Sequence, residues 1–412
     1  MAIYSPQVEP RVRAIAVLSA VVFLVMLGLS IISPVLPFYA QELGATTFMV
    51  GLLVGALAGA RLVVNLPAGA MGDRFGNWRM MQIGLLLITT TSFLAVVAFN
   101  YWMLLAVRIV EGVGSAFYVT SSLAALGRTA PAEKRGRYMG YYVSALLLGQ
   151  ILGPTVGGGV AAVWGLRAPF AFYGTVALVG MFLLVFVHLP ESRAEAADGT
   201  VDWVAVRKLL RNRSFIKVNF GTMSAFFVRS GILSTICPLF FFAKFGWDEA
   251  TIGLLISIAA FSSLVTMLPS GIWADHHGRK LPFTLSFVCT GFVAPLFILP
   301  SDFLGAALVY ALWGLAIGLQ GPVAAWSTDF AKKETMGTAM GLYREMGDLG
   351  FLLGPTILTA IVGVGSFGQN YDISFFFSMA LMLVAAAIIV TAEDPVSENL
   401  RDKKEKATVP ME

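Results

Sequence analysis

The sequence predicts an all-α membrane protein in which twelve transmembrane helices form two pseudo-symmetric six-helix bundles. Of its 412 residues, 57% are hydrophobic and 13% are charged, whereas soluble domains carry about 25% charged residues. Apolar runs of about 20 residues recur along the chain, and each is long enough to cross the hydrocarbon core as a helix. The strands of a membrane barrel would instead alternate over about 10 residues, and the sequence does not show that pattern.

The apolar runs define the expected helices and the boundaries between them. The helices are expected at 14–38, 49–71, 80–98, 101–127, 138–162, 168–189, 214–243, 249–273, 282–300, 302–328, 338–362 and 372–392. The first run is too long for a signal-peptide core, so we expect it to remain as a span. We therefore expect bundles at 1–189 and 214–392, a linker at 190–213 and a disordered, charged tail at 393–412. The linker ends in a basic, amphipathic stretch with Trp203, which predicts a helix on the membrane surface.

Basic residues fall mainly on one side of these spans. Most of the 28 Lys and Arg residues lie at the N-terminus, in the even-to-odd loops, in the linker and in the tail, whereas Arg167 and Lys244 lie on the other side. Basic loops stay in the cytoplasm, so both termini are expected there. We expect an integral multi-pass protein of a prokaryotic plasma (inner) membrane, and the net charge of +4 reflects this topology rather than nucleic-acid binding.

Two loops repeat one residue pattern at a spacing of 202 residues. Both loops follow a proline; the first holds Gly69, Asp73, Arg74 and Gly76, and the second holds Gly271, Asp275, Gly278, Arg279 and Lys280. Other glycines and prolines of the two halves keep nearly the same register. Repetition over so long a stretch predicts two halves of the same topology, with a substrate site between them near the bilayer midplane.

Two further motifs lie within the expected helices. The fourth helix contains Arg108-Ile109-Val110-Glu111-Gly112-Val113-Gly114, and the fifth contains Gly149, Gly153, Pro154, Gly157 and Gly158. With the two loops, these motifs resemble the major facilitator superfamily over nearly the whole chain, and within it the twelve-helix drug:proton antiporter group. The resemblance implies the major facilitator fold, gating by the loops, proton coupling in helix 4 and an antiporter-type motif in helix 5. The sequence departs from the family pattern at Asn77 and Trp78, where basic residues are usual, at His276 in place of arginine, and at Glu111 in place of glutamine.

The resemblance also implies that the loops latch the two halves together on the cytoplasmic side. A carboxylate is stabilised at a helix N-terminus. We hypothesise that Asp73 faces the start of helix 11 near Gly337 and that Asp275 faces the start of helix 5 near Gly136, with the second loop as the stronger latch. Alternatively, the glycines only let the helices turn and pack, and Asp73 is a solvated cap.

Charged residues within the expected spans are the candidates for substrate binding and proton coupling. They are Arg61, Arg108, Glu111, Arg229, Arg344, Glu345 and Asp348. Ionisable groups in hydrocarbon are costly and usually functional. Glu111 and Asp348 share a helix face with Arg108 and Arg344, respectively, and are the best candidates to carry protons. In the alternative, these pairs only neutralise each other, and Arg61 and Arg229 have no partner nearby in the sequence.

These features predict a secondary active transporter that works by alternating access and exports small organic or amphiphilic compounds in exchange for protons. The main alternative is an organic-anion or lipid carrier that uses the arginines, and a non-transporting receptor is less favoured. Without a phosphate-binding GxxxxGK[ST] loop or a catalytic cluster around the three histidines, we expect no enzyme activity, no cofactor and no metal site. The expected partners are a small-molecule substrate, protons and membrane lipids, but no nucleic acid, and the chain is expected to act as a monomer.

Overall fold

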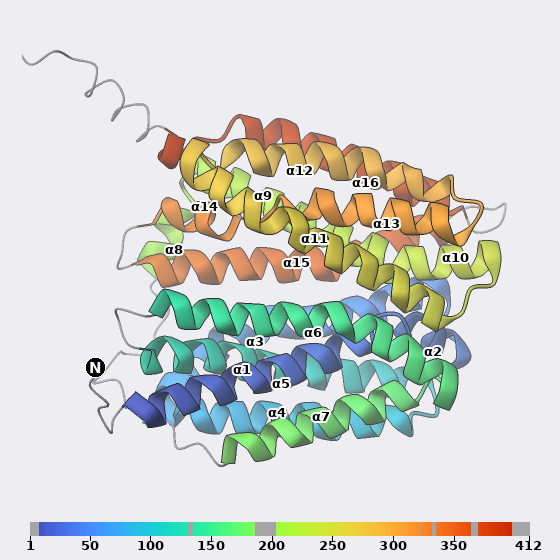
Figure 1. The fold of residues 1–412 in the computed structure, drawn as a ribbon, viewed down its shortest axis with the longest axis horizontal. Coiled ribbons are helices and arrows are strands. Elements are labelled where there is room, and N and C mark those ends of the chain that lie inside the picture. The colour runs from blue at the N-terminus through green and yellow to red at the C-terminus, as the bar shows by residue number, and fades with distance from the viewer. Residues whose placement is uncertain are drawn as a thin grey trace, which may run out of the picture. The chain divides into compact units, whose positions relative to one another are not determined.

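The computed structural model describes residues 8–130, 135–185, 203–321, 323–331, 335–363 and 370–397 (Figure 1). These residues are almost entirely helical and include no β-strand. Twelve helices among them are long and apolar enough to cross a membrane. The predicted all-α membrane fold is therefore confirmed.

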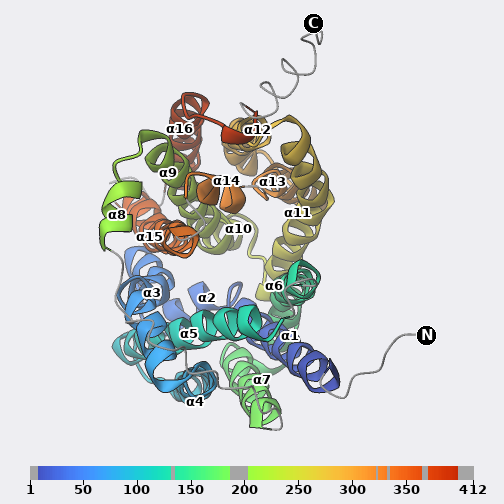
Figure 2. The same cartoon turned by 90° about the vertical axis from the view of Figure 1, so that its left-hand side faces the viewer.

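The first compact unit comprises Met1–Thr200 and Pro238–Ser257. Its helices before the linker are α1 (Val8–Ile31), α2 (Leu36–Glu42), α3 (Thr47–Phe75), α4 (Asn77–Val96), α5 (Tyr101–Thr129), α6 (Arg135–Trp164) and α7 (Ala168–Val185). Within this unit α5 packs along both α3 and α4, while α1 packs along α6 and α7 (Figure 2). Helix α5, which carries two of the candidate charges, is thus flanked by α3 and α4.

The second compact unit comprises Val201–Cys237 and Ile258–Glu412. The helices from the linker onward are α8 (Trp203–Leu209), α9 (Arg213–Val228), the π-helix η2 (Arg229–Ile236), α10 (Cys237–Phe245), α11 (Glu249–His277), α12 (Lys280–Val293), the 3-10 helix η3 (Ala294–Ile298), α13 (Phe303–Gly318), α14 (Val323–Asp329), α15 (Met336–Gly363) and α16 (Tyr371–Val390). Most of α10 and the first residues of α11 belong to the first unit. Helix α15 packs along α9 and η2, and α12 packs along α13 and α16. The predicted bundle and linker boundaries stay a prediction.

The sequence repeat has a structural counterpart in the turns and caps of the helices. Positive φ angles occur at Gly44 and Gly76, and again at the positions 202 residues later, Gly246 and Gly278. Helix N-caps recur in the same register: Thr46 and Asp248 accept a backbone N–H three residues ahead, as do Asn100 and Asp302. An acceptor side chain at the N-cap satisfies a backbone donor that has no partner within the helix. The same local chemistry therefore starts α3, α11, α5 and α13.

Several expected spans are interrupted, and prolines account for two of the interruptions. Helix α1 ends at Ile31, before Pro34, and α2 begins only at Leu36. Helix α12 gives way to η3 at Ala294, directly before Pro295. Proline lacks a backbone N–H and disfavours helical geometry in the residue before it.

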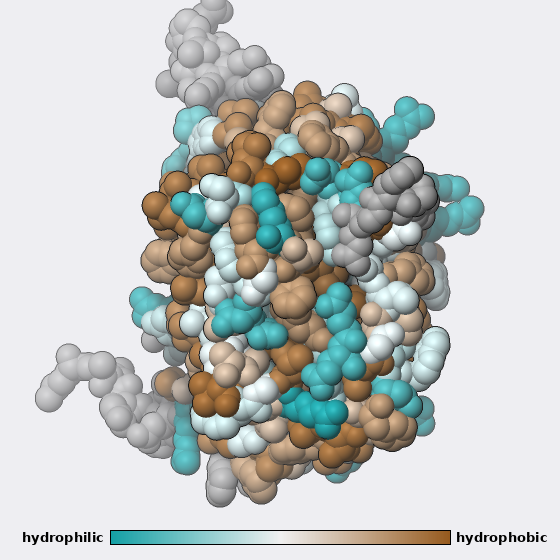
Figure 3. Space-filling model, turned by 90° about the vertical axis from the view of Figure 1, so that its right-hand side faces the viewer, coloured by the Kyte–Doolittle hydropathy of each residue, from teal (hydrophilic) through white to brown (hydrophobic). Residues whose placement is uncertain are grey.

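Large apolar side chains are exposed along many of the spans. Among them are Val63, Val163 and Leu268, each about 70% exposed. A soluble protein would hide contiguous apolar surface of this kind, whereas a span can present it to lipid. On the helix-end face in Figure 3, hydrophilic residues interrupt the hydrophobic ones.

The expected disordered tail does not begin at residue 393. Glu393 and Asp394 make hydrogen bonds to the second unit, and a helical turn covers residues 395–397. A polar, charged sequence can be fixed by specific partners, which composition does not reveal. Residues from 398 onward, and residues 186–202, which include residues 190–202 of the expected linker, lie outside the described residues.

We predict that Gly350→Ala lowers the free energy of unfolding by about 1–3 kcal/mol because a methyl group there overpacks the helix contact. A Cβ at Gly350 would overlap the backbone carbonyl of Met223 on α9. Gly341 lies in the same helix with open space around its Cβ position, so Gly341→Ala serves as the control and should melt at or slightly above the wild-type temperature, because alanine favours a helix over glycine. Thermal unfolding in detergent measures both; equal melting temperatures for the two variants would contradict the prediction.

Candidate functional site

A buried ion pair lies in the middle of α5. Nη1 of Arg108 donates a hydrogen bond to Oε2 of Glu111 at 2.7 Å, and Glu111 is only 1% exposed. Glu111 lies about 15 Å from the start of α5, roughly half the thickness of the hydrocarbon core. The structure therefore shows the contact that the spacing of the two residues indicated.

Side chains from two other helices surround this pair. Arg61 of α3 and Tyr173 of α7 both interact electrostatically with Glu111. Helix α3 comes close because Gly112 has no side chain: a Cβ there would stand 2.5 Å from the carbonyl oxygen of Leu57. Arg61 thus joins Arg108 and Glu111 in one cluster.

Tyr173 is a member of this cluster that the sequence analysis missed. It is almost fully buried, and its ring occupies the space beside Gly28 of α1. Its only signal in the sequence is a hydroxyl within an apolar run, which many interfacial tyrosines also give.

The helix packing around the pair recurs in the second unit. Gly314 of α13 meets the backbone of Ala259 on α11, just as Gly112 of α5 meets the backbone of Leu57 on α3. Both glycines and their partners are related by the spacing of 202 residues. This close approach is therefore a property of the fold in both halves.

The charged residues of this cluster do not recur in the second unit, although the close helix packing does. In the same register, Arg108 and Glu111 correspond to Tyr310 and Trp313, which are fully buried and pack against Phe297. The fold thus accepts an aromatic core at these positions. Because packing does not require the Arg108–Glu111 pair, the charges at these positions need another explanation.

In the second unit, Arg229 lies where the helix changes its geometry. It is the first residue of η2, a π-helix, and π-helical segments are frequent at functional sites. Its side chain is exposed although most of the surrounding span is buried. Tyr343 of α15 interacts electrostatically with Arg229 and with Arg344, so these three residues form a second cluster.

Two acids on α15 lie close to this cluster in the sequence. Glu345 is buried, whereas Arg344 and Asp348 are half-buried. All three have polar or electrostatic contacts in the structure. The expected Arg344–Asp348 pair stays a prediction, as does a role for either acid in proton coupling.

The first gating loop turns at Gly76. Its φ angle of 93° is one that residues with a side chain rarely adopt. Exposed Arg74 lies over the ring of Phe75, with 5.3 Å between Cζ and the ring centroid. Trp78, which stands where a basic residue is usual, donates its indole N–H to the carbonyl of Leu184 at the end of α7. The side chain of Asp73 and the surroundings of Gly136 are not among the described parts of the structure, and Gly69 packs near Thr120 of α5.

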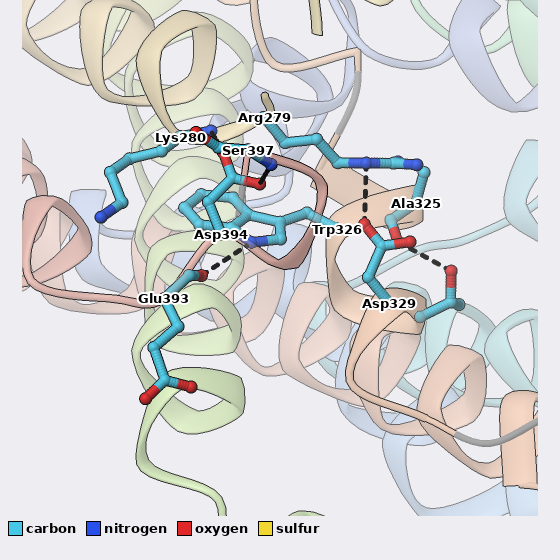
Figure 4. A network of polar contacts seen from close by, with 9 residues as sticks. Arg279, Lys280, Ala325, Trp326, Asp329, Glu393, Asp394 and Ser397 are labelled. Carbon is cyan, nitrogen blue, oxygen red and sulfur yellow. Dashed lines mark hydrogen bonds and ion pairs between the residues drawn. The ribbon is translucent and has the colours of Figure 1, made fainter. Parts of the chain in front are cut away.

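The second gating loop is held by acids from other segments (Figure 4). It turns at Gly278, where φ is 99°. Nε of Arg279 lies 2.8 Å from Oδ2 of Asp329 at the end of α14, and the backbone N–H of Lys280 donates to Oδ2 of Asp394. Gly271 has open space around it, and Asp275 is exposed. The gating role of both loops, and the latch, stay predictions.

The segment after α16 makes hydrogen bonds to other parts of the second unit close to this loop. The indole N–H of Trp326 donates to the carbonyl of Glu393, whose own N–H donates to Ser214 of α9. The Glu393 carboxylate points away from these contacts (Figure 4). Asp394 therefore makes its contact with the loop through its side-chain carboxylate, whereas Glu393 makes its hydrogen bonds through its backbone.

The antiporter-type motif of the expected fifth span lies on α6. It makes close contacts with two other helices, α1 and α11. A Cβ at Gly149, Gly153 or Gly157 would overlap α1, and one at Gly158 would overlap the backbone of Glu249 at the start of α11. The carbonyl of Pro154 lies equally close to Gly253 of α11. The motif thus brings backbones together, and its part in antiport stays a prediction.

Twelve candidate spans, two halves built on one pattern and a buried ion pair within a span define a multi-pass membrane transporter. A sequence profile of the Major Facilitator Superfamily matches residues 18–242 and 218–412. The chain belongs to the major facilitator superfamily. It is therefore an integral membrane protein and a secondary transporter rather than an enzyme, and the proteins of this family bind small-molecule substrates.

Two relatives over most of the chain are drug-resistance proteins. Multidrug resistance protein 2 of Bacillus subtilis (strain 168) is 28% identical over 375 residues, which cover 89% of this chain and 92% of the relative. Quinolone resistance protein NorA of Staphylococcus aureus (strain COL) is 23% identical over 380 residues, covering 92% and 96%. These matches support the resemblance to the drug:proton antiporter group.

One solved structure confirms the fold at low identity. The bacterial homolog of the human lysosomal transporter Spinster, in an inward-facing and unoccupied conformation, superposes with a TM-score of 0.79. The alignment covers 97% of this chain and 98% of that chain at 14% identity. The likeness shows the major facilitator fold alone.

We predict that Asp394→Ala destabilises the start of α12 by about 0.5–2 kcal/mol because a backbone donor loses its capping acceptor. Glu393→Ala is the matched control, since both hydrogen bonds of residue 393 involve its backbone. Hydrogen exchange of the first turn of α12 should quicken only in Asp394→Ala. Equal exchange in both variants would show that the Asp394 side chain does not hold the loop.

We also predict that Arg108→Leu alone lowers stability by about 3–5 kcal/mol because it removes the hydrogen-bonded partner of a buried charge. The double variant Arg108→Leu/Glu111→Leu should melt near the wild-type temperature, since apolar replacement of a whole buried pair is often neutral. Thermal unfolding in detergent compares the two. A double variant as unstable as the single one would mean that the pair serves the fold.

Proposed function

We propose that this protein exports small organic or amphiphilic compounds in exchange for protons and that Glu111 carries the proton. The observation that supports this most is the buried Arg108–Glu111 pair, placed in mid-span at a position where the other half of the fold has Tyr310 and Trp313. A charge in the hydrocarbon core costs free energy. An ion pair that has this cost and no packing role is therefore a candidate for the transport step in which a proton is taken up or released.

The geometry of the carboxyl group suits such a step. Oε2 of Glu111 accepts the hydrogen bond from Arg108, while Oε1 has no hydrogen-bond partner among the described residues. A proton on Oε1 would neutralise Glu111 and weaken its attraction to Arg108 and Arg61. The freed arginine charge can then pair with another group, so protonation changes the electrostatic balance of α3, α5 and α7 together.

The substrate class in this proposal rests on the relatives. Two proteins similar over most of the chain are named for resistance to several drugs and to quinolones. Such compounds are small and amphiphilic, which suits a protein whose spans are rich in aromatic residues. We further propose that the chain works as a monomer in a prokaryotic plasma membrane with both termini in the cytoplasm, because the basic loops lie on that side.

A second candidate function is the transport of organic anions. The observation that favours it is Arg229, which is the first residue of a π-helix inside a span. Tyr343 interacts electrostatically with both Arg229 and Arg344. Two cations near one aromatic hydroxyl could bind the acidic group of a substrate. In this case Arg229→Ala would abolish the transport of anions only.

We predict that Glu111→Gln abolishes proton flux driven by substrate while leaving substrate exchange intact. The amide cannot take up or release a proton, but it keeps the size and polarity of the side chain. Purified protein in liposomes with an internal pH dye is given a quinolone, a lipophilic cation and an aromatic carboxylate in turn. Asp372→Asn, which changes an exposed acid in the first turn of α16, is the control and should keep the proton flux.

Two outcomes would contradict the proposal. Proton flux that persists in Glu111→Gln would remove Glu111 from the coupling step. Transport restricted to the carboxylate, and lost in Arg229→Ala, would replace drug export with anion transport.

A further inference from the structure

A column of buried hydroxyl groups follows Glu111 along one face of α5. Ser115, Tyr118 and Ser122 come four, seven and eleven residues after Glu111, so all four side chains lie on the same side of the helix. None of the four is more than 2% exposed. The column rises about 16 Å from Glu111 to Ser122, which is the distance from mid-membrane to one surface.

The far end of the column reaches the first gating loop. Ser122 Oγ and Tyr142 OH of α6 share a hydrogen bond of 2.7 Å, and both residues are fully buried. The neighbouring Ser121 lies beside that loop, because a Cβ at Gly72 would stand 3.4 Å from Ser121 Oγ. The hydroxyl groups thus extend from the ion pair to the membrane side that carries residues 72–77.

Several polar atoms along this path lack a protein partner. Oε1 of Glu111 and Oγ of Ser121 are buried and form no hydrogen bond among the described residues, and the buried hydroxyl of Tyr118 has Ser122 as its polar neighbour. Buried polar groups are nearly always bonded, and internal water commonly supplies the missing partner. Tyr118 interacts electrostatically with Tyr142 and Tyr173, and Tyr173 interacts with Glu111, so these groups belong to one electrostatic cluster.

The other half of the fold does not preserve the column. In the register that aligns Gly112 with Gly314, Ser115 and Ser122 correspond to Ile317 and Ala324, and Tyr118 to Gln320. Ile317 lies on α13, which ends at Gly318, whereas Gln320 lies in the turn that follows and Ala324 lies on α14. The hydroxyl column, like the ion pair at its end, therefore occurs in the first unit without a counterpart in the same register of the second.

We propose that this column conducts protons between Glu111 and the membrane side that carries the first gating loop. Each hydroxyl group or bridging water accepts a proton on its oxygen and passes its own proton to the next, so every relay group ends neutral. One proton moves along the column, and the Glu111 carboxylate gains it or the carboxylic acid gives it up. The inference rests on the proposed function, because it needs a titrating Glu111.

The test follows the protonation of Glu111 directly and needs no transport substrate. Wild-type protein in lipid nanodiscs is subjected to a rapid drop in pH, and the infrared band of the protonated carboxyl is recorded. The band is assigned by its loss in Glu111→Gln. Tyr118→Phe should slow its rise about tenfold, equivalent to about 1.4 kcal/mol of added barrier, and should leave its final amplitude unchanged.

The control deletes a buried tyrosine hydroxyl elsewhere in the fold. Tyr310→Phe on α13 removes a group as buried as Tyr118 but lies in the second unit, so the band should rise at the wild-type rate. Ser122→Ala provides a second break in the column with little loss of packing, in case Tyr118→Phe folds poorly. It should also slow the band.

The outcomes separate the column from the proposed function. A normal amplitude with wild-type rates in both Tyr118→Phe and Ser122→Ala overturns the column while leaving proton coupling at Glu111 intact. If the wild-type protein shows no band that Glu111→Gln removes, Glu111 does not titrate, and the proposed function fails together with this inference. Slowing by Tyr310→Phe as well would mean that the effect is not specific to the column.

Discussion

The free-energy cost of a charge in hydrocarbon is the constraint on which the candidate site depends. An unpaired ion at mid-span costs several kcal/mol by insertion scales, so a charge there must have a partner. Arg108 and Glu111 meet this requirement within one turn of α5. Arg61 and Tyr173 add electrostatic contacts from α3 and α7, which makes the pair part of the contact between three helices rather than a feature of one.

Close backbone contacts at glycine make this cluster possible. Gly112 lets α3 approach α5, and the approach brings Arg61 near the pair. The glycines of α6 and α15 serve α1 and α9 in the same way. In a membrane, where apolar burial does not drive helices together, such close packing and polar contacts provide the association. The same glycines thus stabilise the fold and position the charges.

The two halves share a backbone pattern but differ in chemistry. Caps and glycine turns recur with the spacing of 202 residues. The first half places an ion pair and a hydroxyl column on α5, whereas the second places Tyr310 and Trp313 at the positions of the ion pair on α13. The second half instead holds its gating loop with Asp329 and Asp394. Comparing the two halves shows that the caps and glycine turns belong to the shared fold, whereas the ion pair is not needed for it.

The sequence by itself determined the class of fold, the number of spans, the repeat and the ion pair, because these depend on composition, spacing and local helix geometry. It did not reveal Tyr173, the partners of the second loop or the ordered residues after α16, because these contacts join segments that are far apart in the chain. In the sequence, Trp78 only departs from the family pattern, which has a basic residue there. The tertiary structure showed that its indole N–H donates a hydrogen bond to the end of α7. Glu111 was evident as a charge in an apolar run, and sequence spacing alone puts the hydroxyl groups of α5 on its side of the helix. Only the tertiary structure showed the hydrogen bond from Ser122 to Tyr142 of α6 and the presence of Tyr173 of α7 beside the ion pair.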